Sequence, residues 1–543
     1  MPTPTPQTAP DRINSIEAEK TSKTAPKNST ARFIIPSVAD LLFIALALAL
    51  SYGAMGRVLL RDSDIGWHIR DGEQILLTHH IPHTDTFSST MIAHTWYAWE
   101  WLYDLLIAGI HHVAGLNGVV FFTAILIAAT FALVLRVTLR RGGNLPCSLF
   151  LLVLALGASS VHFLTRPHVL TWLFTVIWFD LLDDSASSYK AGKRLYWLPM
   201  LMILWVNLHG GFALGFSLLA IYLIGGGIEY SIYTSQRDQI ASWLRHLTGI
   251  TVVTIAASFV NPYGYHLHVH VYRYLSDRFL MNQIIEFRSP DFHSAAQQCF
   301  AILLISTCIS LASTRQKLSP SRLLVLLFAG YSGLYATRNL PTSSLLMTLV
   351  LAPVLSATLS KAATSAWVAF WLRQLFSRLT SFGFRMQELE TNLRGHILVA
   401  VVLALGIWSC VHHGQLASTQ LINAQFDEKR FPVVAADYIS RHDIRQPIFS
   451  LDYWGGYLIY RLYPDTKVVL DDRHDLYGDQ FIKNYLKIVL VQPSFAQELD
   501  QMNVEWVLVP RWSSLANVLR LMPNWTEVHG DGTAALFHRQ HIS

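Results

Sequence analysis

Apolar stretches of about 18 residues recur along the chain, each long enough as a helix to cross about 30 Å of hydrocarbon. Of the 543 residues, 52% are hydrophobic and only 14% are charged, whereas globular proteins carry about 25% charged residues. The sequence therefore predicts a polytopic α-helical membrane protein. About eleven membrane helices are expected, at residues 38–57, 117–138, 146–164, 168–184, 195–209, 211–229, 247–262, 296–313, 321–337, 340–358 and 396–413.

Positive charge falls in every second loop, and short cytoplasmic loops collect Lys and Arg. This pattern predicts a cytoplasmic N-terminus in the inner (plasma) membrane, and it accounts for the net charge of +5 without a nucleic-acid partner. The loop 359–395 also contains "WVAFWLRQLFSRL", which predicts an amphipathic helix on the inner membrane surface. The basic loops include Lys23, Arg32, Arg136, Arg140, Arg141, Lys193, Arg194, Arg237, Arg245, Arg322, Arg373 and Arg378.

Three regions differ in composition. Residues 1–35 are rich in Pro, Thr, Ser and Lys and are expected to form a disordered cytoplasmic tail. Residues 36–413 would form the transmembrane domain, with a long first outer loop at 58–116. Residues 414–543 predict a soluble extracytoplasmic α/β domain, because "QPIFSLDYWGGYLIYRLYP" suggests a strand, a Gly turn and a helix. Further strands are expected at "TKVVLDDRHDLYG", "VEWVLVP" and "AALFHR".

The loops that would face outside carry short polar motifs. They read "TRPH" (165–168), "NLHGG" (207–211), "NPYG" (261–264), "IIEFRSPDF" (284–292) and "TRNLP" (337–341). Ionisable side chains at membrane depth are costly unless they are paired or solvated. Arg166, His168, His209 and Arg338 are therefore expected to face a cavity that opens to the outer face. The alternative is that they cap helix ends among the lipid headgroups.

The first outer loop contains the carboxylates that are candidates for chemistry. Asp62 and Asp64 follow the first apolar segment, and Asp64 and His68, four residues apart, would share one helix face. Glu100 lies in "WYAWEW", where partial desolvation would let it act as a general base at neutral pH. The alternative role for Asp62 and Asp64 is capping of a helix at the membrane exit.

These motifs together resemble the GT-C superfamily of membrane glycosyltransferases. The resemblance is closer to a mostly uncharacterised bacterial group placed with protein mannosyltransferases and lipid A aminoarabinose transferases, and it spans most of the chain. It is carried by Asp62 and Asp64, by "GWHIRDGEQIL…IPHTDTFS…HTWYAWEWL", "RPH" (166–168), "NLHGGF" (207–212), "NPYG", "EFRSPDF" (286–292) and "WGGYLIYRLYP…DDRHDLYG".

The resemblance implies transfer of a sugar from a polyprenyl-phosphate donor, reached through the bilayer, to a hydroxyl of a glycan, lipid or protein acceptor on the extracytoplasmic face. Asp64 is the first choice for the general base and Asp62 the second. Arg166, Arg288 and Arg338 would hold the phosphate, which suits a guanidinium fork. The other expected substrate-binding residues, which would orient sugar hydroxyls or tune the base, are His68, Glu100, His168, Asn207, His209 and Glu286.

Metal binding is left open by the sequence. Two histidine clusters contain metal-binding residue types, but neither has a recognised ligand spacing, so we predict interface-seated histidines and no metal there. Some GT-C enzymes use Mg²⁺ or Mn²⁺ through first-loop carboxylates and others need none, and Asp62 and Asp64 do not decide between these. The clusters are His79, His80, His83 and Asp85, and His266, His268 and His270.

Two features allow other functions. "LDDRHDLYG" contains Asp471, Asp472, Arg473 and Asp475, which suggest a charged turn closed by Asp–Arg pairs, against the alternative of an active centre or acceptor contact. A transporter or flippase for a lipid-linked glycan would need two gates and usually an internal repeat, and no convincing repeat is found. A non-catalytic envelope scaffold is the second alternative.

Overall fold

The structure is a computed structural model that describes residues 31–190, 192–314, 317–393 and 395–540. Each of the eleven predicted membrane segments overlaps one helix. These helices are α3 (Val38–Ser51), α6 (Trp101–Arg140), α7 (Leu145–Ser159), α8 (His168–Ser188), α9 (Trp197–Leu208), α10 (Ala213–Ile232), α11 (Arg237–Ala257), α14 (Ala295–Ser313), α15 (Pro320–Tyr335), α16 (Leu340–Ala362) and α18 (His396–Val411).

Six helical stretches in the described part of the chain are long and apolar enough to cross a membrane. Two more helices, α3 and α18, are apolar but shorter. The chain is thus a polytopic membrane protein, while the number of about eleven crossings stays a prediction. The six stretches are Trp101–Arg140, Leu145–His162, Gly210–Ile232, Thr234–Ala257, Ala295–Ser313 and Thr337–Ala362.

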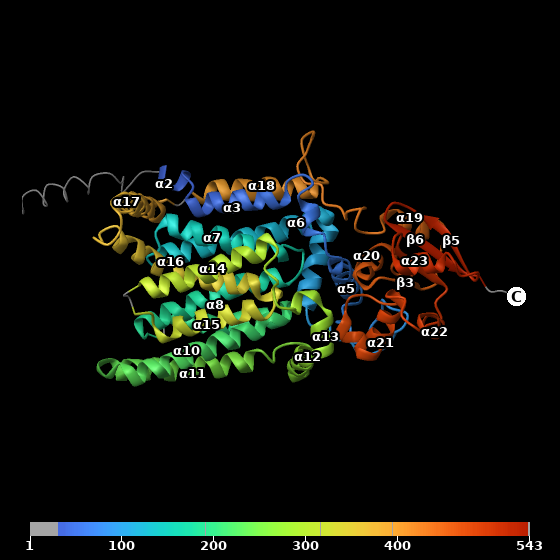
Figure 1. Ribbon diagram of the computed structural model, residues 1–543, viewed down its shortest axis with the longest axis horizontal. Coiled ribbons are helices and arrows are strands. Elements are labelled where there is room, and N and C mark those ends of the chain that lie inside the picture. The colour runs from blue at the N-terminus through green and yellow to red at the C-terminus, as the bar shows by residue number, and fades with distance from the viewer. Residues whose placement is uncertain (1–30, 191, 315–316, 394, 541–543) are drawn as a thin grey trace, which may run out of the picture.

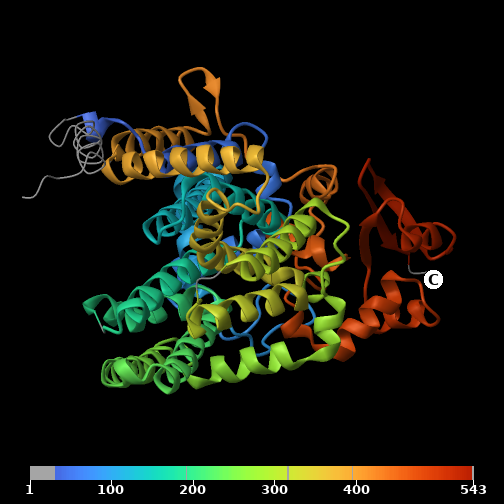
Figure 2. The same ribbon diagram turned by 60° about the vertical axis from the view of Figure 1, so that its left-hand side comes forward.

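The long helices lie side by side, with α17 (Phe370–Asn392) near one end of the bundle and the C-terminal strands beyond the other end (Figure 1). The turned view keeps this order, and α10 and α11 still run together along one edge (Figure 2). Two tryptophans are exposed here, Trp367 just before α17 and Trp371 within it. That exposure suits the expected amphipathic helix at a membrane surface.

Arginines from three of the predicted inner loops meet at one end of the bundle. Arg141 contacts both Asp180 and Asp183 of α8, and Arg322 Nη2 lies 2.9 Å from Asp183 Oδ2. Arg194 Nη2 lies 3.1 Å from Asp180 Oδ2. The loops that carry these arginines therefore share one side of the bundle. That this side faces the cytoplasm remains a prediction from the charge pattern.

The first loop folds into α5 (Asp64–Thr78) and the beginning of α6, which breaks at Gly115 with a φ of 57°. Two glycines let α5 pack very closely on both sides. A Cβ at Gly72 would lie 1.9 Å from the backbone oxygen of Asp104 in α6. A Cβ at Gly66 would lie 2.2 Å from the oxygen of Gly456 in α20 (Asp452–Leu462). Helix α5 is thereby held between the bundle and the C-terminal segment.

The C-terminal segment contains a four-stranded sheet of order β3-β4-β6-β5, in which only β3 and β4 pair in parallel. Some of its apolar residues, such as Trp454, join those of the bundle in one buried cluster, and others, such as Phe449 and Phe537, form a second cluster. The elements are α19 (Val433–Arg441), β3 (Ile448–Ser450), α20, α21 (His474–Val489), α22 (Phe495–Gln501), β4 (Trp506–Pro510), α23 (Ser514–Leu519), β5 (Trp525–Gly530) and β6 (Ala534–Arg539), after a hairpin of β1 (Gln415–Leu416) and β2 (Thr419–Gln420).

Two local predictions for this segment were wrong, and the predicted tail is described only in part. Gly455 and Gly456 lie inside α20 rather than in a turn, because the helix packs against the backbone around Ser63 and Asp471 there. Val468 makes only isolated bridges, to Ser88 and Ile448, so the residues before "DDRHD" are not a strand of the sheet. Residues 31–34 of the expected tail form the helix α2 (Ala31–Ile34), and residues 1–30 lie outside the described residues.

Candidate active site

A cavity of about 350 Å³ lies where helices of the bundle meet α5 and the C-terminal segment. Its wall includes six of the side chains expected from the sequence and several others from distant parts of the chain. The expected ones are Asp64, Glu100, Arg166, His168, His209 and Arg338. The others include Trp67, Trp96, Trp99, Trp172, Tyr274, Phe287, Phe328, Asp472, Arg473 and Asp475.

Asp64 is the first residue of α5 and is only 2% exposed. Its Oδ2 contacts Arg166 Nη2, and Arg166 Nη1 lies 3.2 Å from Asp62 Oδ2. Asp62 also accepts a hydrogen bond from the backbone N–H of Asp64, although the N-cap of α5 is Ser63. Arg166 stabilises the ionised form of Asp64. The other oxygen of Asp64, Oδ1, has no hydrogen-bond partner.

Glu286 joins the two arginines of the cavity. It lies in the short helix η5 (Ile285–Phe287), and Arg338 in η6 (Thr337–Asn339). Glu286 Oε1 is 2.7 Å from Arg338 Nη1, and its Oε2 is 3.9 Å from Arg166 Nη1. Burial raises the pKa of Glu286, but Arg338 and Arg166 outweigh it and lower the pKa to about 2. One permanently ionised carboxylate therefore holds two guanidinium groups close together.

Glu100 is 8% exposed and faces two histidines. Its Oε2 lies 3.8 Å from His68 Nε2, and its Oε1 lies 3.6 Å from His209 Nε2. Burial raises the pKa of Glu100 to about 7, although His68 opposes that shift. His68 Nδ1 in turn lies 2.5 Å from Asp104 Oδ1. The sequence reasoning missed Asp104, although its spacing of four residues from Glu100 places both on one face of α6.

The loop before α21 brings charged residues of the C-terminal segment next to the first loop, which lies far from it in the sequence; Arg473 and its partner Asp85 are 388 residues apart. Arg473 is 4% exposed, and its Nη2 lies 2.7 Å from both Asp85 and Asp471. This pairing is the closed Asp–Arg turn expected from the sequence, but the same turn places Asp472 and Asp475 on the cavity wall. Asp475 Oδ2 lies 3.1 Å from His270 Nε2. In the sequence, the feature that pointed to these two wall residues was the acidic motif "LDDRHDLYG".

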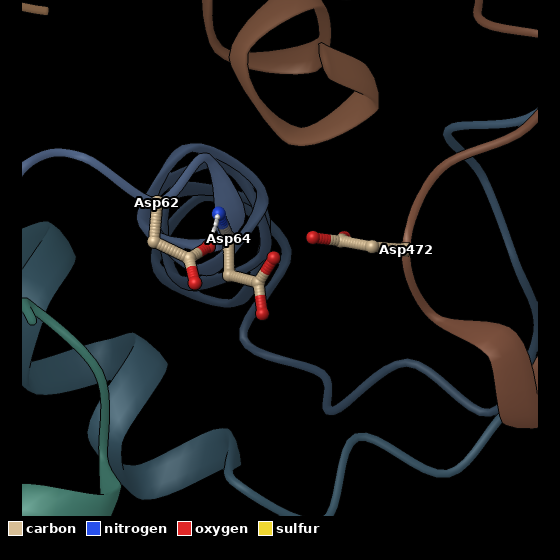
Figure 3. A group of neighbouring side chains, drawn as sticks. All are labelled: Asp62, Asp64 and Asp472. Carbon is tan, nitrogen blue, oxygen red and sulfur yellow. Dashed lines mark hydrogen bonds between the residues drawn. The ribbon is translucent and has the colours of Figure 1, made fainter. Parts of the chain in front are cut away.

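Three carboxylates point toward one another (Figure 3). Asp62 lies just before α5, Asp64 is its first residue, and Asp472 lies in the loop before α21. One oxygen of each lies within 4.8 Å of the others, and Asp64 Oδ1 and Asp472 Oδ1 lack hydrogen-bond partners. Oxygen donors of this kind fit Mg²⁺ or Mn²⁺. Among the residues that the structure describes, neither histidine cluster, around His80 or around His268, forms a comparable group.

Five expected residues lie behind or away from the cavity wall, and one of them, Asp62, contacts the wall residue Arg166. His68 and Glu286 contact wall residues from behind, as described above. Asn207 accepts a hydrogen bond from Trp101 Nε1 (2.8 Å) and donates to the oxygen of Val260 (2.8 Å), so it ties the first loop to the bundle. Arg288 is exposed, and its Nε donates to the oxygen of Asn282 (2.8 Å). Arg288 is not among the residues that line the cavity, and its phosphate-binding role stays a prediction.

No protein-family model matches the chain, and no curated protein matches it. Among solved structures, it is similar to ArnT from Cupriavidus metallidurans bound to undecaprenyl phosphate, at 12% identity and a TM-score of 0.46 over 92% of this chain and 96% of that one. The apo state of ArnT gives a TM-score of 0.45 with the same identity and coverage. Arabinosyltransferase EmbB from Mycobacterium smegmatis gives 12% identity and a TM-score of 0.39, over 74% of this chain and 44% of that one. At these values the likeness transfers no substrate and no residue role to this chain.

Proposed function

We propose that the chain is a GT-C-type membrane glycosyltransferase that moves a sugar from a polyprenyl-phosphate donor to an acceptor hydroxyl on the extracytoplasmic face. One observation carries the proposal. A buried carboxylate with a free oxygen, Asp64, shares a cavity with Arg166 and Arg338. A base and two cations able to bind a phosphate are the groups that this transfer needs.

The cavity wall suits the two ends of such a donor. Leu214 and Phe328 come from helices of the bundle and offer apolar surface to an isoprenoid chain. Arg166 and Arg338, linked by Glu286, offer N–H donors to a phosphate. Indole and phenol rings, on which the apolar face of a sugar ring can stack, come from Trp67, Trp96, Trp99 and Tyr274.

The chemistry follows from this arrangement. Asp64 Oδ1 takes the proton of the acceptor hydroxyl, and the acceptor oxygen attacks the anomeric carbon. The bond from that carbon to the phosphate oxygen breaks, and its electrons leave with the phosphate. Arg166 and Arg338 stabilise the departing group by charge-assisted hydrogen bonds. Where a divalent cation is used, Asp62, Asp64 and Asp472 would hold it, and it would add positive charge beside the phosphate.

The function is tested by mass spectrometry of lipid-linked sugars in cells that lack the protein. An unused polyprenyl-phosphate sugar should accumulate on the outer leaflet and should disappear when the wild-type gene is restored, but not when the Asp64→Asn gene is restored. Accumulation on the inner leaflet would instead indicate a transporter. Unchanged lipid-linked sugars would contradict the proposal.

Arg338→Ala is expected to raise the KM for the polyprenyl-phosphate donor about 10- to 100-fold. The physical reason is the loss of hydrogen bonds to a charged group, which contribute about 1.5–3 kcal/mol. Arg288→Ala is the matched control, because Arg288 lies two residues from Glu286 but outside the cavity. Initial rates at varied donor concentration measure both variants, and an equal effect of the two changes would argue against a phosphate site at Arg338.

A further inference from the structure

A row of buried ionisable side chains extends from the cavity wall into the packing between α5 and α6. It runs from Glu100 through His68 and Asp104 to Asp71, and Asp71 and Asp104 are both 0% exposed. Both oxygens of Asp71 and Oδ2 of Asp104 lack hydrogen-bond partners. A buried carboxylate pair is stable only when a proton is shared between the two groups. Burial and the neighbouring Asp104 raise the pKa of Asp71 well above its usual range, so the pair keeps one proton between its two carboxyl groups.

The proton shared by Asp71 and Asp104 fixes the hydrogen bonding of His68. With that proton on the side of Asp104 that faces Asp71, the other oxygen of Asp104, Oδ1, is left as an acceptor, and His68 Nδ1 lies 2.5 Å from it. Nδ1 of His68 therefore carries the ring hydrogen, and Nε2 presents a lone pair. This Nε2 is the atom that faces Glu100 Oε2. Burial lowers the pKa of His68 to about 4, so the ring is neutral.

His209 is fixed in the opposite tautomer. The backbone N–H of Gly211 donates to His209 Nδ1 at 3.0 Å, so Nδ1 is an acceptor. The hydrogen of His209 is therefore on Nε2, which faces Glu100 Oε1. One oxygen of Glu100 thus faces an acceptor and the other faces a donor. A protonated carboxyl group, with one hydroxyl and one carbonyl oxygen, matches this pair of neighbours, and an ionised carboxylate does not.

We propose that Glu100 is the general acid of the transfer and that His68, Asp104 and Asp71 are positioning residues that keep it protonated. This inference rests on the proposed function. As the bond between the anomeric carbon and the phosphate oxygen breaks, Glu100 gives its proton to the departing phosphate, while Asp64 takes the proton of the acceptor hydroxyl. After product release, Asp64 loses a proton to water and Glu100 regains one, so the enzyme returns to its starting state.

The contrast between Asp64 and Glu100 supports this division of roles. Asp64 contacts the guanidinium group of Arg166, whereas Glu100 faces two histidine rings and has a pKa of about 7. Two carboxyl groups held in opposite protonation states are the arrangement that acid–base catalysis needs. The charged and ionisable groups that face Glu100 from the surrounding elements are His68, Asp104, His209, Arg338 and Asp475, and those that face His68 also include Asp62 and Arg473.

The test is the pH dependence of kcat in the full-length protein. Because protonated Glu100 is the active form, wild-type kcat should fall as the pH rises through about 7. In Asp104→Asn, the amide donates to His68 Nδ1 and moves the ring hydrogen to Nε2. Two donors then face Glu100 and favour its ionised form, so the fall in kcat should move to lower pH by about one unit. A merely structural role of Asp104 would lower kcat equally at every pH.

Two further variants keep the inference testable. Glu73→Gln, on the same helix as His68 and Asp71 but paired with Arg70 and His111, is the matched control and should leave the pH profile unchanged. Glu100→Gln is the second test variant, to be used if Asp104→Asn does not fold. Its kcat should be at least about 100-fold lower than that of the wild type and should no longer fall as the pH rises. A pH profile of Glu100→Gln that matches the wild type would overturn the inference, while the proposed transfer would stand.

Infrared spectroscopy tests the arrangement without any substrate. The proton shared by Asp71 and Asp104 should give a carboxylic acid carbonyl band that persists above the usual titration range of an aspartate and is lost in Asp71→Asn. Absence of that band in the wild type would overturn the positioning role. A wild-type protein with this band but no sugar transfer would instead count against the proposed function, and the general-acid role would fall with it.

Discussion

Asp64→Asn is expected to lower the rate of sugar transfer by about 10²- to 10⁴-fold, the usual contribution of a general base. The amide keeps the shape of the side chain but cannot take the proton of the acceptor. It also leaves Arg166 with Asp62 and Glu286 as partners, so the cavity should keep its form. Transfer from a radiolabelled polyprenyl-phosphate sugar in purified, detergent-solubilised protein measures the loss.

Asp62→Asn is the comparison that isolates Asp64. Asp62 lies beside the same arginine and is the second candidate for the base, but it also accepts a hydrogen bond from the backbone of Asp64. A smaller loss in Asp62→Asn than in Asp64→Asn would assign the base to Asp64. Wild-type turnover by an Asp64→Asn protein with normal size-exclusion behaviour would rule out that assignment.

Arg473→Met is expected to cost about 3–5 kcal/mol of stability, the typical effect of removing one partner from a buried ion pair. The change leaves Asp85 of the first loop and Asp471 of the C-terminal segment as uncompensated buried charges. Arg473 also lies over the ring of Trp96, with its guanidinium carbon 4.6 Å from the ring centre. Thermal unfolding in detergent, together with proteolysis of the C-terminal segment, measures the effect.

The control for that variant is Arg445→Met, which removes an arginine from an exposed pair with Asp443 in the same segment. Exposed pairs contribute little, so its unfolding temperature should stay close to that of the wild type. If the two variants unfolded at the same temperature, Arg473 would not be what holds the C-terminal segment to the first loop. That segment supplies Asp472 and Asp475 to the cavity, so its attachment also bears on activity.

Part of the site was predictable because its signal is local in the sequence. Asp64 and His68 lie four residues apart on one helix, and Arg166 and Arg338 lie in polar motifs at the ends of apolar segments. Arg288 shows the limit of that reasoning. It lies in the same motif as Glu286, but Glu286 pairs with Arg338 of the cavity wall, whereas Arg288 binds the backbone at Asn282.

The sequence by itself determined that this is a membrane protein and where its helices run, because hydropathy is a property of each segment alone and does not depend on its neighbours. Tertiary structure alone decided that Asp472 meets Asp64, that Glu286 joins two arginines, and that Asp71 and Asp104 are buried beside each other. These are contacts between residues on different elements, and their protonation states depend on burial. Both arise only when α5, the bundle and the C-terminal segment pack together and exclude water from the groups between them.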